Sequence, residues 1–110
     1  MAFIEINSLR KHSPIKGFTG RFVHTDNETF SFWDIMKGAQ LPEHSHPQEQ
    51  TSIVVKGTFR LVVEGISRDL SNGTIAVIPA NAVHSGTALT DCEIMDIFHP
   101  VREDYRALDT

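Results

Sequence analysis

The sequence predicts an all-β fold, an antiparallel β-sandwich or jelly-roll barrel with a short helical tail in the last ten residues. Short apolar and β-branched runs follow one another closely, and Gly, Pro and Asn-Gly turns separate them. No amphipathic helix lies between these runs, and 110 residues leave no length for the crossovers of a parallel sheet. We therefore expect one antiparallel domain over residues 1–110.

Five strands follow from these runs. The segment after Gly57 and the segment after Gly65 form a hairpin around a Glu64-Gly65 turn, and two later runs end at Pro79 and before Pro100. The expected strands are residues 29–36, 58–63, 66–70, 74–78 and 92–98.

The first of these strands carries large apolar groups on both faces. Its residues alternate, so that Phe30 and Phe32 lie on one face and Trp33 and Ile35 on the other. Because each apolar face needs cover, we expect a second subunit on one side of the sheet, and hence a homodimer.

Composition excludes several classes of protein. The formal charge is −4 and no dense Lys/Arg cluster is present, which argues against nucleic-acid binding. No run approaches the ~20 apolar residues of a membrane helix, and residues 1–10 lack a signal-peptide pattern. Cys92 is the only cysteine and is interpreted as a buried, inert thiol. We expect a cytoplasmic protein that acts on a small organic molecule.

Histidines suggest a metal site. His44 and His46 are two residues apart, so an extended chain places both imidazoles on one face, where they can bind one ion. Gln50 falls on the same face if the extended phase continues, and His84 can complete the set from a neighbouring strand. Pro47 could change this phase, which keeps Gln48 and Glu49 as alternative donors. The remaining histidines, His12, His24 and His99, are interpreted as surface or packing residues.

The spacing around these donors forms two motifs. The first runs from Gly38 through His44-x-His46 and Gln50 to Gly57, and the second runs from Gly73 through Pro79 and Asn81 to His84. Together they resemble the two cupin motifs in order and spacing. This resemblance implies a barrel in which His44, His46, Gln50 and His84 face inward and hold one divalent metal ion.

Three positions depart from the cupin pattern. Asn81 replaces a glycine and Ala88 replaces an asparagine, which concern only turn geometry, since Asn also tolerates a left-handed backbone. Gln50 replaces the usual glutamate, so the ion keeps its full +2 charge and is a stronger Lewis acid. The site thus favours polarising a substrate over activating dioxygen. The ion stays open among Zn, Mn, Fe and Ni.

The last predicted strand places a carboxylate among apolar residues. Ile94, Asp96 and Phe98 share one face, and Arg102 follows Pro100. A carboxylate on an inner face beside a metal is a candidate acid or base, although an ion pair with a nearby Arg is the structural alternative. The guanidinium of Arg102 suits a substrate carboxylate.

The stretch from Asp96 to Tyr105, with the sequence DIFHPVREDY, carries a narrower resemblance when taken with His44-Ser45-His46-Pro47 and Gln50. It is similar to the small cupins of the KdgF family, which convert the 4,5-unsaturated monouronates released by pectin and alginate lyases into linear keto forms. The resemblance implies that Asp96, Phe98 and Arg102 act on a sugar acid. Asp96 would transfer protons, the metal would polarise an oxygen, Arg102 would bind the carboxylate and Phe98 would line the sugar.

Two other functions remain open. A metal-dependent dioxygenase would use the same four donors with bound oxygen. A sugar-binding or small-acid-binding module without catalysis is the other alternative, although such modules usually accompany a DNA-binding domain, for which this chain has no room.

Overall fold

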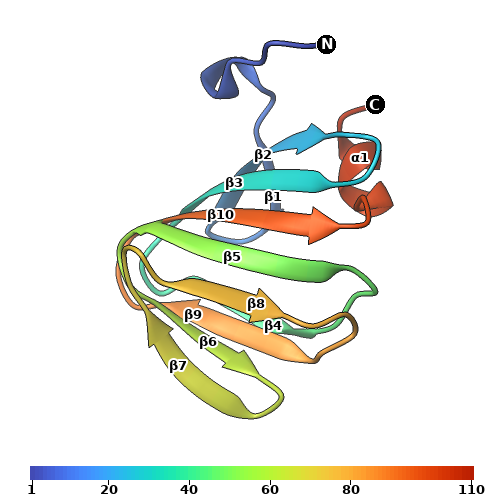
Figure 1. Ribbon diagram of the computed structural model, residues 1–110. Coiled ribbons are helices and arrows are strands. Elements are labelled where there is room, and N and C mark those ends of the chain that lie inside the picture. The colour runs from blue at the N-terminus through green and yellow to red at the C-terminus, as the bar shows by residue number, and fades with distance from the viewer.

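Two antiparallel sheets packed face to face form the protein, and they confirm the predicted antiparallel all-β sandwich (Figure 1). The computed structural model describes residues 1–110. The larger sheet has the order β1 (His12–Ile15), β2 (Phe18–His24), β3 (Thr29–Ile35), β10 (Cys92–His99), β5 (Glu49–Lys56), β8 (Ile75–Ile78). The smaller sheet has the order β4 (Gln40–His44), β9 (His84–Ala88), β6 (Phe59–Val63), β7 (Ile66–Leu70). A 3₁₀ turn, η1 (Ile6–Ser8), precedes the strands and a helix, α1 (Glu103–Leu108), follows them.

Strand alternation fills the space between the sheets. In β3, Ser31, Trp33 and Ile35 share one face, as predicted, and this face is the buried one, while Phe32 on the other side is only half-buried. Aromatic rings fill one end of the interior, where Phe18 packs edge-on against Trp33 and Phe59. This apolar core fixes the two sheets at the end opposite the histidines.

The predicted turns occur where the sequence placed them. Glu64 (φ 48°) and Gly65 (φ 77°) join β6 to β7 as a two-residue hairpin turn. Asn81 adopts φ 64°, so it supplies the left-handed backbone at the position of the family's glycine.

Five strands lie outside the five predicted ranges, namely β1, β2, β4, β5 and β9. β2 was hidden because Gly20 interrupts its apolar alternation. The structure explains this glycine, since a Cβ there would lie 2.6 Å from the Trp33 ring. In β4, Pro42 and Glu43 leave little apolar pattern, and Leu41 is the only aliphatic residue of the strand that is typical of a core.

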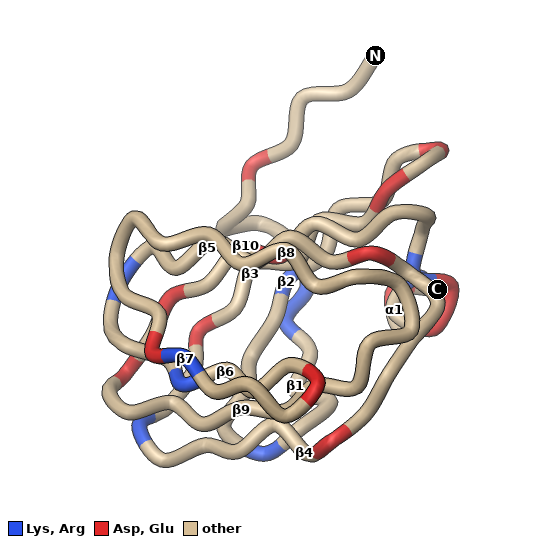
Figure 2. The backbone as a smooth tube through the Cα atoms, turned by 60° about the horizontal axis from the view of Figure 1, so that its bottom comes forward, with Lys and Arg blue, Asp and Glu red and all other residues tan.

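The tail predicted as helical contains α1, which covers six of the last eight residues. The structure has no helix with the length and apolar character needed to cross a bilayer. Figure 2 shows Lys and Arg scattered along the chain and interleaved with Asp and Glu. Cys92 is buried, as expected.

Candidate metal centre and active site

Three histidines meet at one end of the smaller sheet. His44 ends β4 and His84 begins β9, and the two are direct partners in the antiparallel ladder. His46 lies in the connection between β4 and β5. One ring nitrogen of each histidine lies within 4.8 Å of the other two, so the group could hold a metal ion.

Backbone carbonyls fix the tautomer of all three rings. Nδ1 of His44 lies 2.8 Å from the Pro42 carbonyl oxygen. Nδ1 of His46 lies 3.0 Å from that of Gln48, and Nδ1 of His84 lies 2.9 Å from that of Ala82. A carbonyl oxygen can only accept, so each Nδ1 carries the proton and each Nε2 presents a lone pair. This is the tautomer that a metal ligand needs.

Burial favours the neutral forms of His46 and His84. It lowers the pKa of His84 to about 4 and also lowers the pKa of His46, on which the positive charge of Arg102 acts in the same direction. Nε2 of His84 is buried without a hydrogen-bond partner. An orphaned, unprotonated nitrogen directed at two others is the observation that a divalent cation would explain.

Gln50 supplies a fourth donor. Its Oε1 lies 3.0 Å from Nε2 of His46. With the proton of His46 on Nδ1, two acceptors face each other, an arrangement that a shared cation stabilises. The structure thus brings all four predicted donors together: His44, His46, Gln50 and His84.

Gln48 and Glu49, the two alternative donors, do not join the histidine group. The side-chain amide of Gln48 donates to the Val101 carbonyl oxygen at 3.1 Å, which ties the β4–β5 connection to the segment after β10. Glu49 is exposed, on the opposite side of β5 from Gln50. His12 and His24 pair with Asp109 of the C-terminal tail, and His99 is exposed.

A hydrogen-bonded chain leads from this donor set to Asp96. Nε2 of Gln50 donates to Oγ of Ser52 at 2.9 Å, and Ser52 donates to Oδ1 of Asp96 at 2.6 Å. Ser52 is two residues beyond Gln50 on the inner side of β5 and is the register partner of Asp96 in β10. The sequence analysis did not identify Ser52. The signal that could have found it is its position two residues after Gln50, which places both side chains on the same face of a strand.

Asp96 is a buried carboxyl group with no ion pair. Burial raises its pKa to about 6, and hydrogen bonds from Ser52, Gln50 and Trp33 act in the opposite direction. The ion pair with Arg102 that the sequence allowed is absent, because the partner of Arg102 is Asp104. Asp96 therefore has the environment of an acid or base rather than of a structural anion.

Arg102 is buried against the aromatic rings of Phe98 and Tyr105. Its guanidinium carbon lies 4.8 Å from the Phe98 ring centroid and 3.9 Å from that of Tyr105. Two of its nitrogens donate to the Asp104 carboxylate, at 2.9 and 2.6 Å. Asp104 shows that this guanidinium can hold a carboxylate in a two-point contact. Tyr105, also missed in the sequence, has its pKa raised to about 12 by burial and stays protonated.

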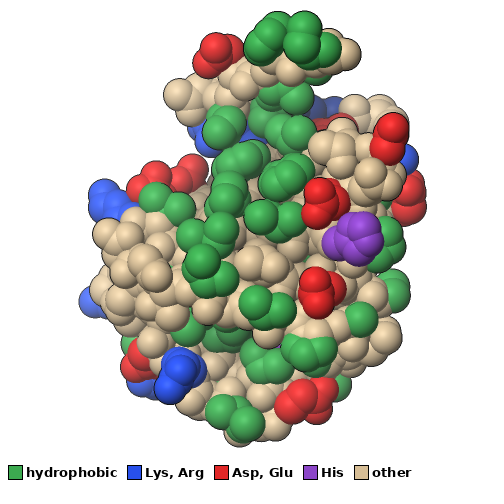
Figure 3. Space-filling model, in the orientation of Figure 1, with side chains coloured by type: hydrophobic (Ala, Val, Ile, Leu, Met, Phe, Trp, Pro, Cys, Tyr) green, Lys and Arg blue, Asp and Glu red, His purple; other side chains and the backbone are tan.

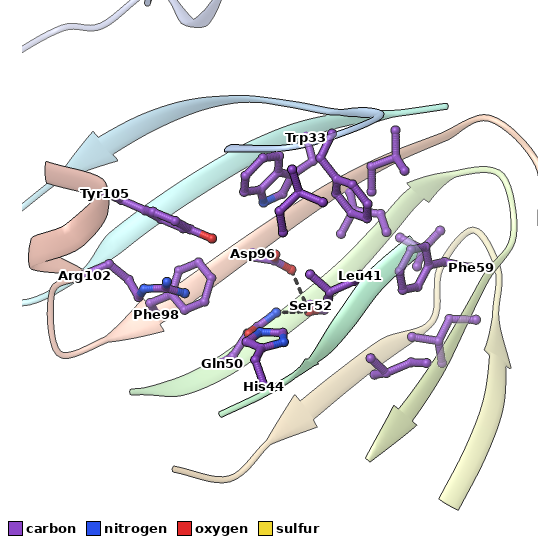
Figure 4. A pocket seen from close by; sticks show the side chains of 17 residues that line it. Trp33, Leu41, His44, Gln50, Ser52, Phe59, Asp96, Phe98, Arg102 and Tyr105 are labelled. Carbon is purple, nitrogen blue, oxygen red and sulfur yellow. Dashed lines mark hydrogen bonds between the residues drawn. The ribbon is translucent and has the colours of Figure 1, made fainter. Parts of the chain in front are cut away.

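One pocket has a polar side and an apolar side, and it is lined by seven of the side chains described above: His44, Gln50, Ser52, Asp96, Phe98, Arg102 and Tyr105 (Figure 4). Figure 4 shows Asp96, Ser52, Gln50 and His44 directed toward its middle, with Arg102, Phe98 and Tyr105 at one end and Trp33 and Phe59 at the other. The arrangement suits a small ligand with a carboxylate and a ring.

Comparison with solved structures agrees with this architecture. The structure of KdgF from Halomonas sp. superposes with a TM-score of 0.89 at 28% sequence identity, over 96% of this chain and 98% of that chain. An RmlC-like cupin from Shewanella frigidimarina gives a TM-score of 0.89 at 24% identity, over 96% of each chain. A variant of oxalate decarboxylase from Bacillus subtilis gives 0.80 at 17% identity, over 88% of this chain and 29% of that chain. The last two similarities show the fold alone.

No curated protein sequence matches the chain. The sequence pattern of the cupin domain matches residues 31–98, which include all four donors as well as Ser52, Asp96 and Phe98. With the two-sheet fold and the histidine group inside it, this match shows that the chain belongs to the cupin family.

Proposed function

We propose that this cupin converts 4,5-unsaturated monouronates into their linear keto forms, a ring opening followed by tautomerisation without redox change. The observation that carries the proposal is the buried, unpaired carboxyl of Asp96, joined through Ser52 to the donor Gln50. The similarity to KdgF from Halomonas sp. supports it. The residues matched to the KdgF family in the sequence, Asp96, Phe98 and Arg102, also line one pocket.

The substrate reaction needs two proton transfers. The anomeric hydroxyl loses a proton, its oxygen forms the carbonyl at carbon 1, and the bond from carbon 1 to the ring oxygen breaks. The ring oxygen keeps that electron pair as an enolate on carbon 5. Carbon 4 then gains a proton while the carbonyl at carbon 5 forms, so atoms and electrons balance.

Asp96 can make both transfers. With a pKa of about 6, its carboxyl group is present in both protonation states near neutral pH, so it can accept the hydroxyl proton and return one to carbon 4. Ser52 donates to one oxygen of this carboxyl group, Oδ1, and so fixes its orientation. His44, His46, Gln50 and His84 would hold a divalent ion, which as a Lewis acid stabilises negative charge on a substrate oxygen.

Arg102 and Phe98 position the substrate. The guanidinium of Arg102 would donate hydrogen bonds to the uronate carboxylate, which would bind beside Asp104 or replace it. The ring of Phe98 lies beside both Arg102 and His46, 5.5 Å from the latter, and forms an apolar wall for the sugar ring.

The test uses unsaturated monouronates made by a polysaccharide lyase. The conjugated double bond between carbons 4 and 5 absorbs in the ultraviolet, so conversion is followed as loss of absorbance above the spontaneous rate. We expect the metal-loaded protein to accelerate this loss without consuming dioxygen. No acceleration with any of Zn, Mn, Fe or Ni would contradict the proposal, and oxygen uptake would favour the dioxygenase alternative.

A further inference from the structure

Tyr105 places a hydroxyl group in the pocket whose proton has no acceptor. Its ring lines the pocket, and Figure 4 shows its oxygen directed toward the middle, on the side of Asp96. Arg102 acts on this oxygen as a positive charge and as a hydrogen-bond donor. The nearby carboxylates have other donors, since Asp96 accepts from Ser52. Asp104 accepts from Arg102. No group of the chain accepts from the Tyr105 hydroxyl, so this hydrogen bond is free for a ligand.

The ring of Tyr105 is held on several sides. It stacks on Phe22, with ring centroids 4.6 Å apart and planes 5° from parallel. The Arg102 guanidinium carbon lies 3.9 Å from the centroid of the same ring. Trp33 and Phe98 meet the ring edge to face, at centroid distances of 6.0 and 5.7 Å. A donor fixed in this way needs no rearrangement when negative charge develops near it, which is the condition for electrostatic stabilisation of a transition state.

Burial also fixes the protonation state of this phenol. It raises the pKa of Tyr105 to about 12, and the negative charges of Asp96 and Asp104 act in the same direction, against Arg102. Figure 3 shows the outer side of the larger sheet as a continuous surface, without an opening into the pocket behind it. At neutral pH the hydroxyl is therefore a hydrogen-bond donor and cannot act as a base.

The position of Arg102 determines which substrate atom meets the hydroxyl. In an unsaturated monouronate, the carboxylate is bonded to carbon 5, and carbon 5 also carries the ring oxygen. A carboxylate bound to Arg102 therefore brings the ring oxygen to the end of the pocket that Arg102 shares with Tyr105. Figure 4 shows His44 and Gln50 on another side of Asp96. The Tyr105 hydroxyl is thus the neutral donor at the ring oxygen.

We propose that Tyr105 is a further catalytic residue, whose hydroxyl donates a hydrogen bond to the ring oxygen while the enolate forms on it. When the bond from carbon 1 to the ring oxygen breaks, the oxygen keeps the electron pair, and the O–H dipole of the phenol stabilises the new negative charge. The phenol keeps its proton, so Asp96 still makes both proton transfers. This inference rests on the proposed function, because the ring oxygen becomes charged in that reaction.

The test compares Tyr105→Phe with the wild type on lyase-generated unsaturated monouronates. The variant loses the hydroxyl but keeps the ring that stacks on Phe22 and contacts Arg102. We expect kcat to fall about tenfold to a hundredfold, because a hydrogen bond to a charged oxygen is lost, while KM and the bound metal stay unchanged. Arg102→Ala is the contrasting variant, since it should act mainly on KM.

A second measurement uses the fact that Tyr105 is the only tyrosine of the chain, so its ultraviolet band reports on this hydroxyl. Galacturonate has the carboxylate and the ring oxygen but no double bond, so it cannot form the enolate. Its binding to the metal-loaded wild type should shift the tyrosine band to longer wavelength, and the same titration of Tyr105→Phe gives the contribution of Trp33 for subtraction.

Three results would overturn the inference and leave the proposed function intact. They are a Tyr105→Phe variant with the wild-type kcat, a change in KM alone, and bound galacturonate without the tyrosine shift. A wild type that does not convert unsaturated uronates would overturn both.

Discussion

The two ends of the interior are built from the same strands but contain opposite chemistry. In β5 the inward residues change from Gln50 through Ser52 to Val54, and in β10 they change from Asp96 to Ile94 and Cys92. At the apolar end, burial is favourable and aromatic rings interlock. At the polar end, the same burial lowers the pKa values of His46 and His84 and raises that of Asp96. One end therefore stabilises the fold, and the other holds groups in reactive protonation states.

Removing a metal donor should have the largest effect on the polar end. His84→Ala and His46→Ala each delete one of the three converging imidazoles, and we expect most of the bound metal and nearly all uronate conversion to be lost. Elemental analysis of the purified variants measures the metal. Stoichiometric metal in the double variant would contradict the donor assignment.

Asp96→Asn should separate chemistry from metal binding. The amide keeps the size of the side chain but cannot accept a proton, and losing a positioned acid or base costs about a hundredfold to ten-thousandfold in rate. We expect the variant to fold and to keep its ion, with the loss in kcat. Arg102→Ala is the comparison, since it should act mainly by raising KM.

If Asp96→Asn converts uronates as fast as the wild type with its metal intact, the proton-transfer role is wrong. The dioxygenase and binding-module alternatives then become the leading interpretations.

At the apolar end, Phe59→Ala should reduce stability and leave the metal in place. Phe59 is 4% exposed and contacts Phe18, so its truncation should cost about 3–5 kcal/mol of unfolding free energy. Urea unfolding monitored by Trp33 fluorescence measures this cost. Loss of metal from a folded Phe59→Ala variant would show that the two ends are not separate.

The pH dependence of stability should reveal the cost of burying Asp96. Its pKa is about 6 when folded in the metal-free protein, against 3.8 for the free side chain, so between these values the folded state binds one proton more than the unfolded state. The contribution of Asp96 to the free energy of unfolding is fully present below pH 4 and is lost as the pH rises through 6. The loss is about 3 kcal/mol.

The Asp96→Asn variant isolates this contribution from those of the histidines. The quantity of interest is the unfolding free energy of metal-free Asp96→Asn minus that of the metal-free wild type. Between pH 4 and pH 7.5 this difference should rise by about 3 kcal/mol in favour of the variant. Urea unfolding at both values measures the difference. A difference that does not change with pH would show that Asp96 titrates normally.

Sequence reasoning predicted which residues lie at the polar end better than it predicted which of them contact one another. Spacing and strand phase are local, so they placed Gln50 and Asp96 on inner faces and located the two motifs. The position of Ser52 opposite Asp96 depends on the register between β5 and β10, and 44 residues of sequence separate these two side chains. The strands β2 and β4 were missed for a local reason, because Gly20 and Pro42 interrupt their apolar alternation.

The smallest expected effect concerns the choice of amide over carboxylate at position 50. The chain of bonds is directional, because the Gln50 amide donates to Ser52 and the Ser52 hydroxyl donates to Asp96. A carboxylate at position 50 has no proton to donate, so Ser52 would lie between two acceptors with only one proton. Gln50→Glu should bind the metal at least as tightly, since a carboxylate adds a charge-charge attraction, yet convert uronates more slowly, by about tenfold.

Ser52 variants distinguish a broken chain from weaker Lewis acidity in that experiment. Ser52→Ala removes the link and leaves the charge at the metal unchanged, so a similar loss in kcat with unchanged metal affinity would assign the effect to the positioning of Asp96. Ser52→Thr keeps the hydroxyl and should restore most of the rate. If Ser52→Ala matches the wild type while Gln50→Glu is slow, the amide acts through the charge of the metal alone. If Gln50→Glu is faster than the wild type, neither explanation of Gln50 is correct.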